Sequence, residues 1–184
     1  QVAIDNGINT VVEFLDKSLA ERIVSEYGMA DAYVAANVMC HIPYINSVVE
    51  GIKALLNPDG IAMFEDPYLG DVIQKTTYDQ IYDEHTFLFS VYSIQYLFNQ
   101  FDMEVINVEP QVTHGGSMRY VIAHKGAKPV HKNVYKQLEY EQVSGLTDFE
   151  TYEKFRQNCG KYQSDLMSLL DDIKSQGKSI AGYA

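Results

Sequence analysis

The sequence predicts an α/β fold, because stretches with helical periodicity alternate with short apolar runs that are typical of buried strands. Two strand-like runs, at 103–108 and 118–123, follow one another and are joined by a connection suited to an antiparallel pair. We therefore expect a mostly parallel sheet with one antiparallel strand at its end and helices packed against it.

The first part of the chain supplies two helices and two strands. Apolar residues at helical spacing predict a helix over 10–27 and a second over 46–56, for which Asn46 is the expected N-cap. Short apolar runs predict buried strands at 31–38 and 61–64. This alternation of helix and strand is typical of an α/β sheet.

A turn and two further helices complete the predicted elements. The sequence Asn-Pro-Asp-Gly at 57–60 predicts a turn, because Pro fixes one dihedral and Gly permits a positive φ. Helices are predicted over 91–101 and over most of 146–176, and a strand is expected to begin at 178–180. The polar stretch 125–131 indicates a domain boundary.

The composition is that of a soluble globular protein with a strongly acidic balance. The 184 residues carry 25 Asp and Glu against 14 Lys and Arg, so the formal net charge is −11. Such a surface repels phosphate backbones, which argues against nucleic-acid binding. No apolar run approaches the roughly 20 residues of a membrane span, and we expect no signal peptide. The two cysteines have neither disulfide nor metal-ligand spacing, so a reduced, cytoplasmic protein without a metal site is expected.

A possible acid–base site lies in the long segment that follows the second strand. Tyr82, Glu84 and His85 are close together there, and a helical turn would place Tyr82 and His85 on one face with Glu84 off it. A His can take a proton at neutral pH, a carboxylate can orient it, and a Tyr hydroxyl can donate to a carbonyl oxygen as charge develops. These groups suit proton removal next to a carbonyl. The alternative is a capped loop with a surface His.

Other polar residues follow predicted strands, which is where ligands of open α/β sheets bind. Asn37 and His41 follow the first strand, and Glu65 and Asp66 follow the second. His41 either joins the site or simply caps a helix or bonds to backbone. The run His-Gly-Gly-Ser at 114–117 is either a tight loop near a ligand or plain turn chemistry, in which Gly supplies backbone freedom.

Several motifs, in the same order, resemble those of the sugar C-methyltransferases. They are Ala-Asn-x-x-x-His-Ile at 36–42, Leu-Leu-Asn-Pro-Asp-Gly at 55–60, Phe-Glu-Asp-Pro-Tyr-Leu-Gly-Asp at 64–71, Tyr-x-Glu-His at 82–85, His-Gly-Gly-Ser-x-Arg at 114–119 and Ser-Ile-Ala-Gly-Tyr at 179–183. Tyr-x-Glu-His together with His-Gly-Gly-Ser is the most specific part of the resemblance, which runs over most of the chain.

The resemblance implies an enzyme that uses S-adenosylmethionine to methylate a ring carbon beside the ketone of a nucleotide-linked keto-deoxysugar. A base would remove the α-proton, and the enolate carbon would attack the methyl group of the sulfonium. The cofactor methyl is already activated, so no metal is required for the transfer.

The resemblance also assigns roles by position. His85 is the candidate base, Glu84 and Tyr82 would position the substrate or stabilise the enolate, and His41 would contribute to the same site. Asn37 would lie near the cofactor. The candidate substrate-binding residues are His114, Ser117 and Arg119.

Two domains are implied: a partial Rossmann-like methyltransferase domain of the class I type at 1–128 and the start of a C-terminal α/β domain at 129–184. Family members carry an N-terminal zinc-binding domain, a glycine-rich cofactor loop and an acidic residue for the cofactor ribose, and the sequence contains none of them. We expect these parts upstream of residue 1, with zinc confined to them and this fragment by itself inactive. The alternatives are a methyltransferase of the same fold with an oxygen or nitrogen acceptor, and a non-catalytic binding domain. The sequence names neither the sugar nor the oligomeric state.

Overall fold

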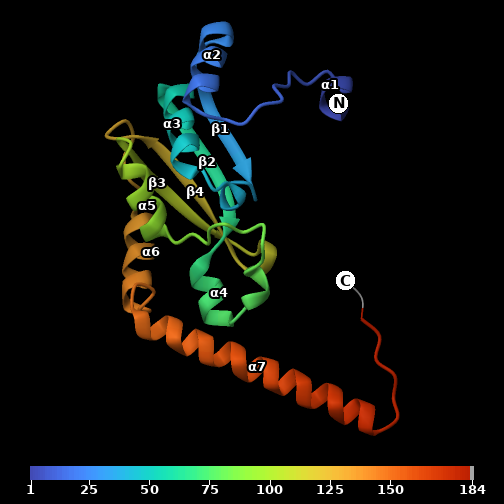
Figure 1. The fold of residues 1–184 in the computed structure, drawn as a ribbon. Helices are drawn as coiled ribbons and strands as arrows, with labels where there is room; N and C mark the ends of the chain where they lie inside the picture. The colour runs from blue at the N-terminus through green and yellow to red at the C-terminus, as the bar shows by residue number, and fades with distance from the viewer. Residues whose placement is uncertain (183–184) are drawn as a thin grey trace.

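The computed structural model describes residues 1–182 and contains a four-stranded sheet (Figure 1). Its spatial order is β1-β2-β4-β3, built from β1 (Ala30–Ala36), β2 (Leu56–Pro67), β3 (Met103–Gln111) and β4 (Ser117–His124). Strands β1 and β2 are parallel, whereas β4 runs antiparallel to both of its neighbours. The predicted α/β class with a partial Rossmann-like sheet is confirmed. The antiparallel strand lies inside the sheet and not at its end, because the hairpin from β3 returns β4 into the space beside β2.

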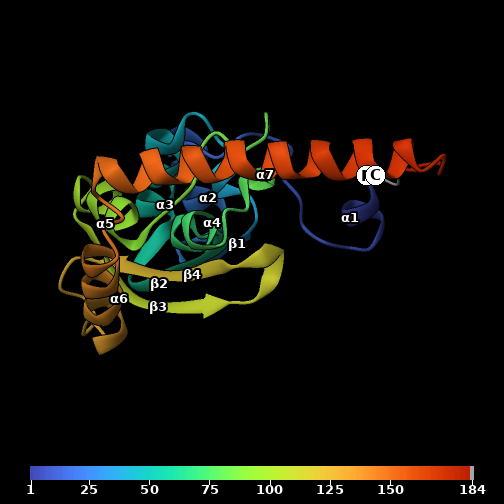
Figure 2. The ribbon, with the colours of Figure 1, turned by 90° about the horizontal axis from the view of Figure 1, so that it is seen from below.

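The helices vary widely in length and surroundings. They are α1 (Val2–Asp5), α2 (Lys17–Tyr27), α3 (Ile45–Leu55), α4 (Leu69–Lys75), α5 (Val91–Asn99), α6 (Lys132–Val143) and α7 (Phe149–Ser175), with 3₁₀ turns η1 (Met39–His41), η2 (Tyr78–Gln80) and η3 (Thr113–Gly115). Figure 2 shows α3, α4 and α5 on one side of the strands. Helix α3 provides the crossover between the parallel strands β1 and β2, as parallel pairing requires.

The hydrophobic core lies between the sheet and these helices. The ring of Phe64 on β2 lies 5.9 Å from that of Phe98 on α5 and 5.0 Å from that of Tyr120 on β4, centroid to centroid. All three side chains are fully buried. Burying a side chain of this size contributes about 1.5–3 kcal/mol, so this aromatic stack joins the central strands to α5.

Two helix starts differ from the prediction. Helix α2 begins at Lys17, well inside the predicted range 10–27, because the Asp16 carboxylate accepts a hydrogen bond from the Leu19 N–H at 2.7 Å and caps the helix there. Asn46 is not the N-cap of α3, since the helix already begins at Ile45 and Tyr44 holds the cap position.

Strand β1 lies where predicted but is not buried: Val34 is 65% exposed. Among the described residues β1 pairs only with β2, so it forms an edge of the sheet. Its apolar run indicates the strand correctly, whereas burial depends on what covers that strand.

The predicted turn at 57–60 is incorporated into β2 as an irregularity in the pairing between Ala30 and Ala32. The Asn57 side chain still accepts a hydrogen bond from the Asp59 N–H at 3.0 Å, so the local bend persists. Gly60 is needed for a reason other than positive φ. A Cβ there would lie 2.9 Å from the Ala30 carbonyl oxygen, so only glycine permits this close approach.

The predicted helices over 91–101 and 146–176 and the two closing strands are confirmed, with shifts of a few residues at their ends. A strand does not begin at 178–180, where the chain has no regular structure, because no neighbouring strand pairs with it in the part of the chain that the structure describes. The last residue of the Ser-Ile-Ala-Gly-Tyr motif, Tyr183, lies outside the described residues.

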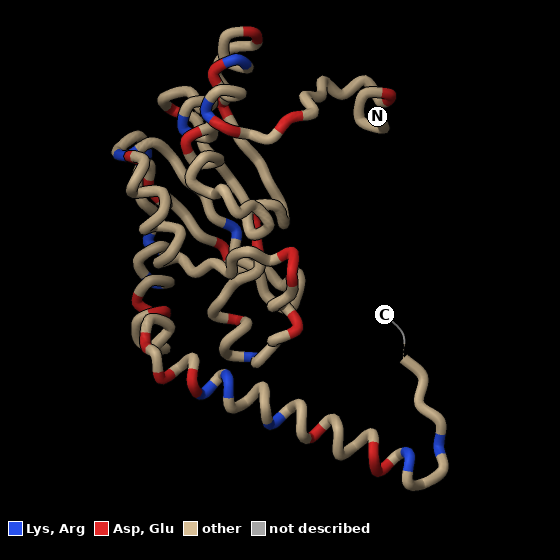
Figure 3. The backbone as a smooth tube through the Cα atoms, in the orientation of Figure 1, with Lys and Arg blue, Asp and Glu red and all other residues tan. Residues whose placement is uncertain are grey.

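Helix α7 extends away from the sheet (Figure 1) and has acidic and basic residues along its length (Figure 3). Its apolar residues recur at helical spacing but are open to solvent, with Leu166 50% and Leu169 55% exposed. Within residues 1–182, the search for a helix with the length and hydropathy to cross a membrane finds none.

Candidate functional site

Two histidines from distant parts of the sequence meet beyond the carboxyl ends of the parallel strands. His41 lies on η1, directly after β1, and His85 lies in the loop after η2. Their ring centroids are 4.9 Å apart with the planes inclined at 48°. The buried Cys40 lies beside them, and its thiol sulfur and one ring nitrogen of each histidine lie within 4.8 Å of one another.

Both ring nitrogens of His85 make hydrogen bonds. Nδ1 lies 2.7 Å from the Gln80 carbonyl oxygen, and Nε2 lies 2.9 Å from the Tyr82 hydroxyl. A carbonyl can only accept, so Nδ1 carries the proton and the neutral ring presents the lone pair of Nε2 to Tyr82. The half-buried imidazole is thereby held in the tautomer that a general base requires. The prediction that Tyr82 and His85 share a face is confirmed.

His41 is held in the same way. Its Nδ1 lies 2.7 Å from the carbonyl oxygen of Glu84, so it donates to backbone and leaves Nε2 as the acceptor. The Glu84 side chain is exposed, in agreement with its predicted position off the shared face. Glu84 therefore orients His41 through its main chain, and its carboxylate faces solvent.

A carboxylate that the sequence reasoning left without a role lies beneath the histidines. Asp66, near the end of β2, is 1% exposed, and its Oδ1 accepts a hydrogen bond from the Cys40 N–H at 3.2 Å. Its Oδ2 is buried and has no hydrogen-bond partner. Burial raises the pKa of Asp66, while His41 and His85 act in the opposite direction. In the sequence, the signal that could have drawn attention to Asp66 was its position directly after a predicted buried strand.

The side chains of Cys40, His41 and His85 form a donor set that could hold a metal, and their hydrogen bonds also suit proton chemistry. Burial and the neighbouring Asp66 raise the pKa of the Cys40 thiol. The Nε2 lone pair of His85 is engaged by Tyr82.

Asn37, the candidate cofactor residue, follows β1 in a left-handed conformation with φ 53°. Its N–H donates to the Glu65 carbonyl oxygen at 2.7 Å, whereas its side-chain Oδ1 is buried without a hydrogen-bond partner. An unpaired buried acceptor is unfavourable, so a hydrogen-bond donor that reached this oxygen would be stabilising.

The candidate substrate residues lie on the β3–β4 hairpin, next to the end of β2. Ser117 is buried and pairs in register with Pro67, and its hydroxyl donates to the Thr113 carbonyl at 3.1 Å. His114 is exposed, with φ 52°. The structure therefore places these two at the same end of the sheet as the histidines.

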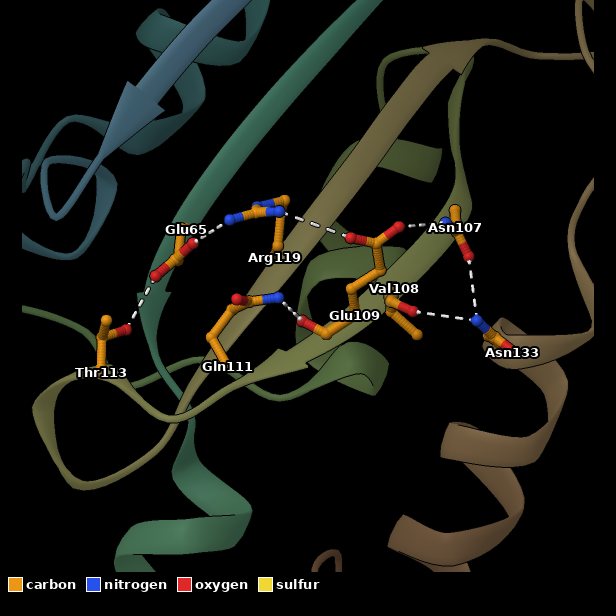
Figure 4. Close-up of polar contacts among 8 residues, drawn as sticks. All are labelled: Glu65, Asn107, Val108, Glu109, Gln111, Thr113, Arg119 and Asn133. Carbon is orange, nitrogen blue, oxygen red and sulfur yellow. Dashed lines mark hydrogen bonds and ion pairs between the residues drawn. The ribbon is translucent and has the colours of Figure 1, made fainter.

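Arg119 is enclosed by acidic groups, as Figure 4 shows. Its guanidinium donates to Glu65 at 2.9 Å and to Glu109 at 3.5 Å, and Glu65 also accepts from the Thr113 hydroxyl at 2.8 Å. These strands lie side by side, so the network crosses β2, β4 and β3. Arg119 is only partly exposed, and binding of a diphosphate there would require the carboxylates to release it.

Comparison with known proteins shows which proteins the sequence resembles. Residues 112–184 match the family described as "C-methyltransferase C-terminal domain". Over 183 residues the sequence is 31% identical to C-methyltransferase NovU from Streptomyces niveus, a match that covers 99% of this chain and 44% of that protein. These matches show that the chain is similar to C-methyltransferases. It spans less than half the length of this curated relative.

Solved structures are also among the matches of this chain. A SAM-dependent methyltransferase from Anabaena variabilis ATCC 29413 gives a TM-score of 0.48 at 18% identity, covering 67% of this chain and 64% of that one. The PH0226 protein from Pyrococcus horikoshii OT3 gives a TM-score of 0.43 at 15% identity, with the same coverage of 67% and 64%.

Proposed function

We propose that this chain forms part of an S-adenosylmethionine-dependent C-methyltransferase that acts on a nucleotide-linked keto-deoxysugar. The observation that carries the proposal is the His85 imidazole, whose Nδ1 is fixed by a carbonyl at 2.7 Å and whose Nε2 meets a phenol at 2.9 Å. This arrangement suits removal of a proton beside a ketone, which is the step that carbon methylation requires and that transfer to oxygen or nitrogen does not.

The proposed chemistry begins with the Tyr82 hydroxyl. When it turns from His85 to the substrate's ketone oxygen, it frees the Nε2 lone pair for the α-proton. The C–H bonding electrons then form the enolate, whose oxygen the same hydroxyl stabilises. The proton resides on Nε2, and the positive imidazolium stays hydrogen-bonded through Nδ1 to Gln80. His41, whose ring lies 4.9 Å from that of His85, bounds the site on the other side.

We propose that the cofactor binds at the end of β1. The unpaired, buried Oδ1 of Asn37 is the acceptor that would bind it. When bound, S-adenosylmethionine supplies an activated methyl group to the carbon nucleophile. The chain's own contribution is to align that carbon, for which correct positioning is worth several orders of magnitude in rate.

Two further parts of the proposal concern organisation. We place a methyltransferase unit at 1–128 and the start of a second domain at 129–184, divided at the polar connection between β4 and α6. We also place the protein in the cytoplasm, which agrees with its two free cysteines.

The experiment is hydrogen–deuterium exchange at the sugar α-carbon, catalysed by the complete natural protein in D₂O and followed beside methylation. The wild type is expected to catalyse both. His85→Gln should reduce both by about 10²–10⁴-fold, whereas the control His124→Gln, whose ring contacts the Leu56 carbonyl on β2, should retain them. Methylation of the substrate without any α-proton exchange would refute the proposal and indicate an oxygen or nitrogen acceptor. Full activity of His85→Gln would refute the assigned base.

A further inference from the structure

The carboxylate of Asp66 lies at the junction of the two segments that carry the histidines. Its Oδ1 accepts from the Cys40 N–H at 3.2 Å, and the Cys40 carbonyl in turn accepts from the Phe87 N–H at 3.1 Å. Cys40 adjoins His41 on η1, and Phe87 follows His85 by two residues. One residue therefore ties both histidine-bearing segments together, and Asp66 holds that residue from the end of β2.

The second oxygen of Asp66 has no hydrogen-bond partner in the protein although the residue is 99% buried. A buried carboxylate without full pairing costs folding free energy. An amide of the same shape would avoid the charge and could keep the contact with Cys40. The carboxylate at this position is therefore unfavourable for stability, which suggests that its charge serves the site above it.

Ionisable groups on several elements interact electrostatically with Asp66. They are Tyr33 on β1, Cys40 and His41 on η1, His85 in the loop after η2 and Tyr120 on β4. Burial raises the pKa of Tyr33, Cys40 and Tyr120, so these three stay neutral at physiological pH. Of these five groups, the imidazoles of His41 and His85 are the ones that can become positively charged.

We propose that Asp66 is a positioning residue that fixes the His41–His85 pair through Cys40 and stabilises the positive charge that His85 gains with the α-proton. This inference rests on the function proposed above. It adds a buried counter-charge to the acid–base step: as the proton moves from carbon to Nε2, the new imidazolium faces an existing carboxylate instead of apolar surroundings.

The test compares Asp66→Asn, Asp66→Ala and the control Asp102→Asn in the complete natural protein. Asp102 is an exposed carboxylate, 84% accessible at its side chain, near the opposite end of the sheet. Each variant is measured for melting temperature, kcat, KM, α-proton exchange and the pH–rate profile. Asp102→Asn should match the wild type in all of the catalytic readouts.

Asp66→Asn should lower kcat and α-proton exchange by about 10–100-fold, the range seen when an outer partner of a functional His is removed. KM should stay nearly constant, and the melting temperature should equal or exceed that of the wild type. The acid limb of the pH–rate profile should move to lower pH, because the imidazolium has lost a neighbouring negative charge. Asp66→Ala also removes the contact with Cys40, so it should lose more activity and melt at a lower temperature.

A merely structural role predicts a different pattern. If Asp66→Asn melts at a lower temperature and its remaining folded protein shows wild-type kcat and pH profile, the inference is overturned. Equal kcat in the Asn and Ala variants would overturn the holding role through Cys40. Failure of the proposed function is separately visible, because the wild type would then show no α-proton exchange at all and His85→Gln would change nothing.

Discussion

Glu141 of α6 caps helix α5 across the fold. Its Oε1 accepts hydrogen bonds from the Val91 N–H at 2.7 Å and the Tyr68 hydroxyl at 2.9 Å, and its Oε2 accepts from the Tyr92 N–H at 2.9 Å. Val91 and Tyr92 begin α5, where backbone N–H groups have no partner within the helix. The carboxylate is 1% exposed, so we predict that Glu141→Gln destabilises the protein.

The magnitude follows from what the amide can replace. Its carbonyl oxygen can keep the two contacts of Oε1, but its NH₂ group would face the Tyr92 N–H, and neither can accept. One charge-assisted hydrogen bond is lost and one buried donor is left unpaired, which costs about 1–3 kcal/mol. Burying the neutral Gln amide costs less free energy than burying the Glu carboxylate, and this difference offsets part of the loss. The net destabilisation at pH 7 should therefore stay within the same range of about 1–3 kcal/mol.

Urea-induced unfolding measures this loss as a lower midpoint with an unchanged m-value. Glu139→Gln is the matched control, because Glu139 is exposed on the same helix, and it should change stability by less than about 0.5 kcal/mol. If Glu141→Gln unfolds within about 0.5 kcal/mol of the wild type, the capping role is wrong.

The pH dependence supplies a second check on Glu141. Burial raises the pKa of Glu141 in the folded protein above its unfolded value of about 4.3. Its stability contribution is therefore fully present below the unfolded pKa and is lost as pH rises through the folded pKa. The stability advantage of the wild type over Glu141→Gln should thus shrink as pH rises from 4 to 7. An advantage that grows with pH would mean that the hydrogen bonds outweigh burial.

Two other predictions test the site and its supporting loop. Tyr82→Phe keeps the ring contact with His85, whose centroid lies 4.1 Å away, but removes the hydroxyl; kcat should fall about 10–100-fold, and steady-state methylation with unchanged kcat would contradict the role of Tyr82. Gly116→Ala should destabilise the protein by about 1–3 kcal/mol, because φ is 140° and a Cβ would clash with the Asp71 side chain. Gly160→Ala, in open space on α7, should by comparison leave stability unchanged or raise it by up to about 1 kcal/mol, and thermal melting of the two variants decides whether they differ in this direction.

Part of the fold was predictable from interactions between residues that are close in the sequence. The periodicity over 91–101 indicates α5, because the apolar side chains that share one face of that helix are the ones that the core receives. The prediction failed where a local competitor was stronger, as at Asp16, whose carboxylate caps α2 later than the apolar pattern suggests. It also failed at 57–60, where turn residues lie within β2 because a neighbouring strand passes Gly60 closely.

The same distinction between local and long-range contacts applies to the candidate site. Tyr82 and His85 lie three residues apart, so a single turn is enough to join their side chains, and the sequence predicts that contact by itself. His41 is 43 residues away from Glu84, and its place beside His85 depends on the path of β1 and of the loop after η2. The burial of Asp66 and its contact with Cys40 could not be predicted, because a carboxylate after a strand has no distinctive sequence pattern.

The sequence by itself determined the alternation of helices and strands, the closing hairpin and the pairing of Tyr82 with His85, because each depends on interactions between near neighbours. Only the tertiary structure decided that β4 enters the sheet beside β2 and that Asp66 lies buried near two histidines. Those features depend on which distant surfaces exclude water and supply partners, and no local pattern encodes that information.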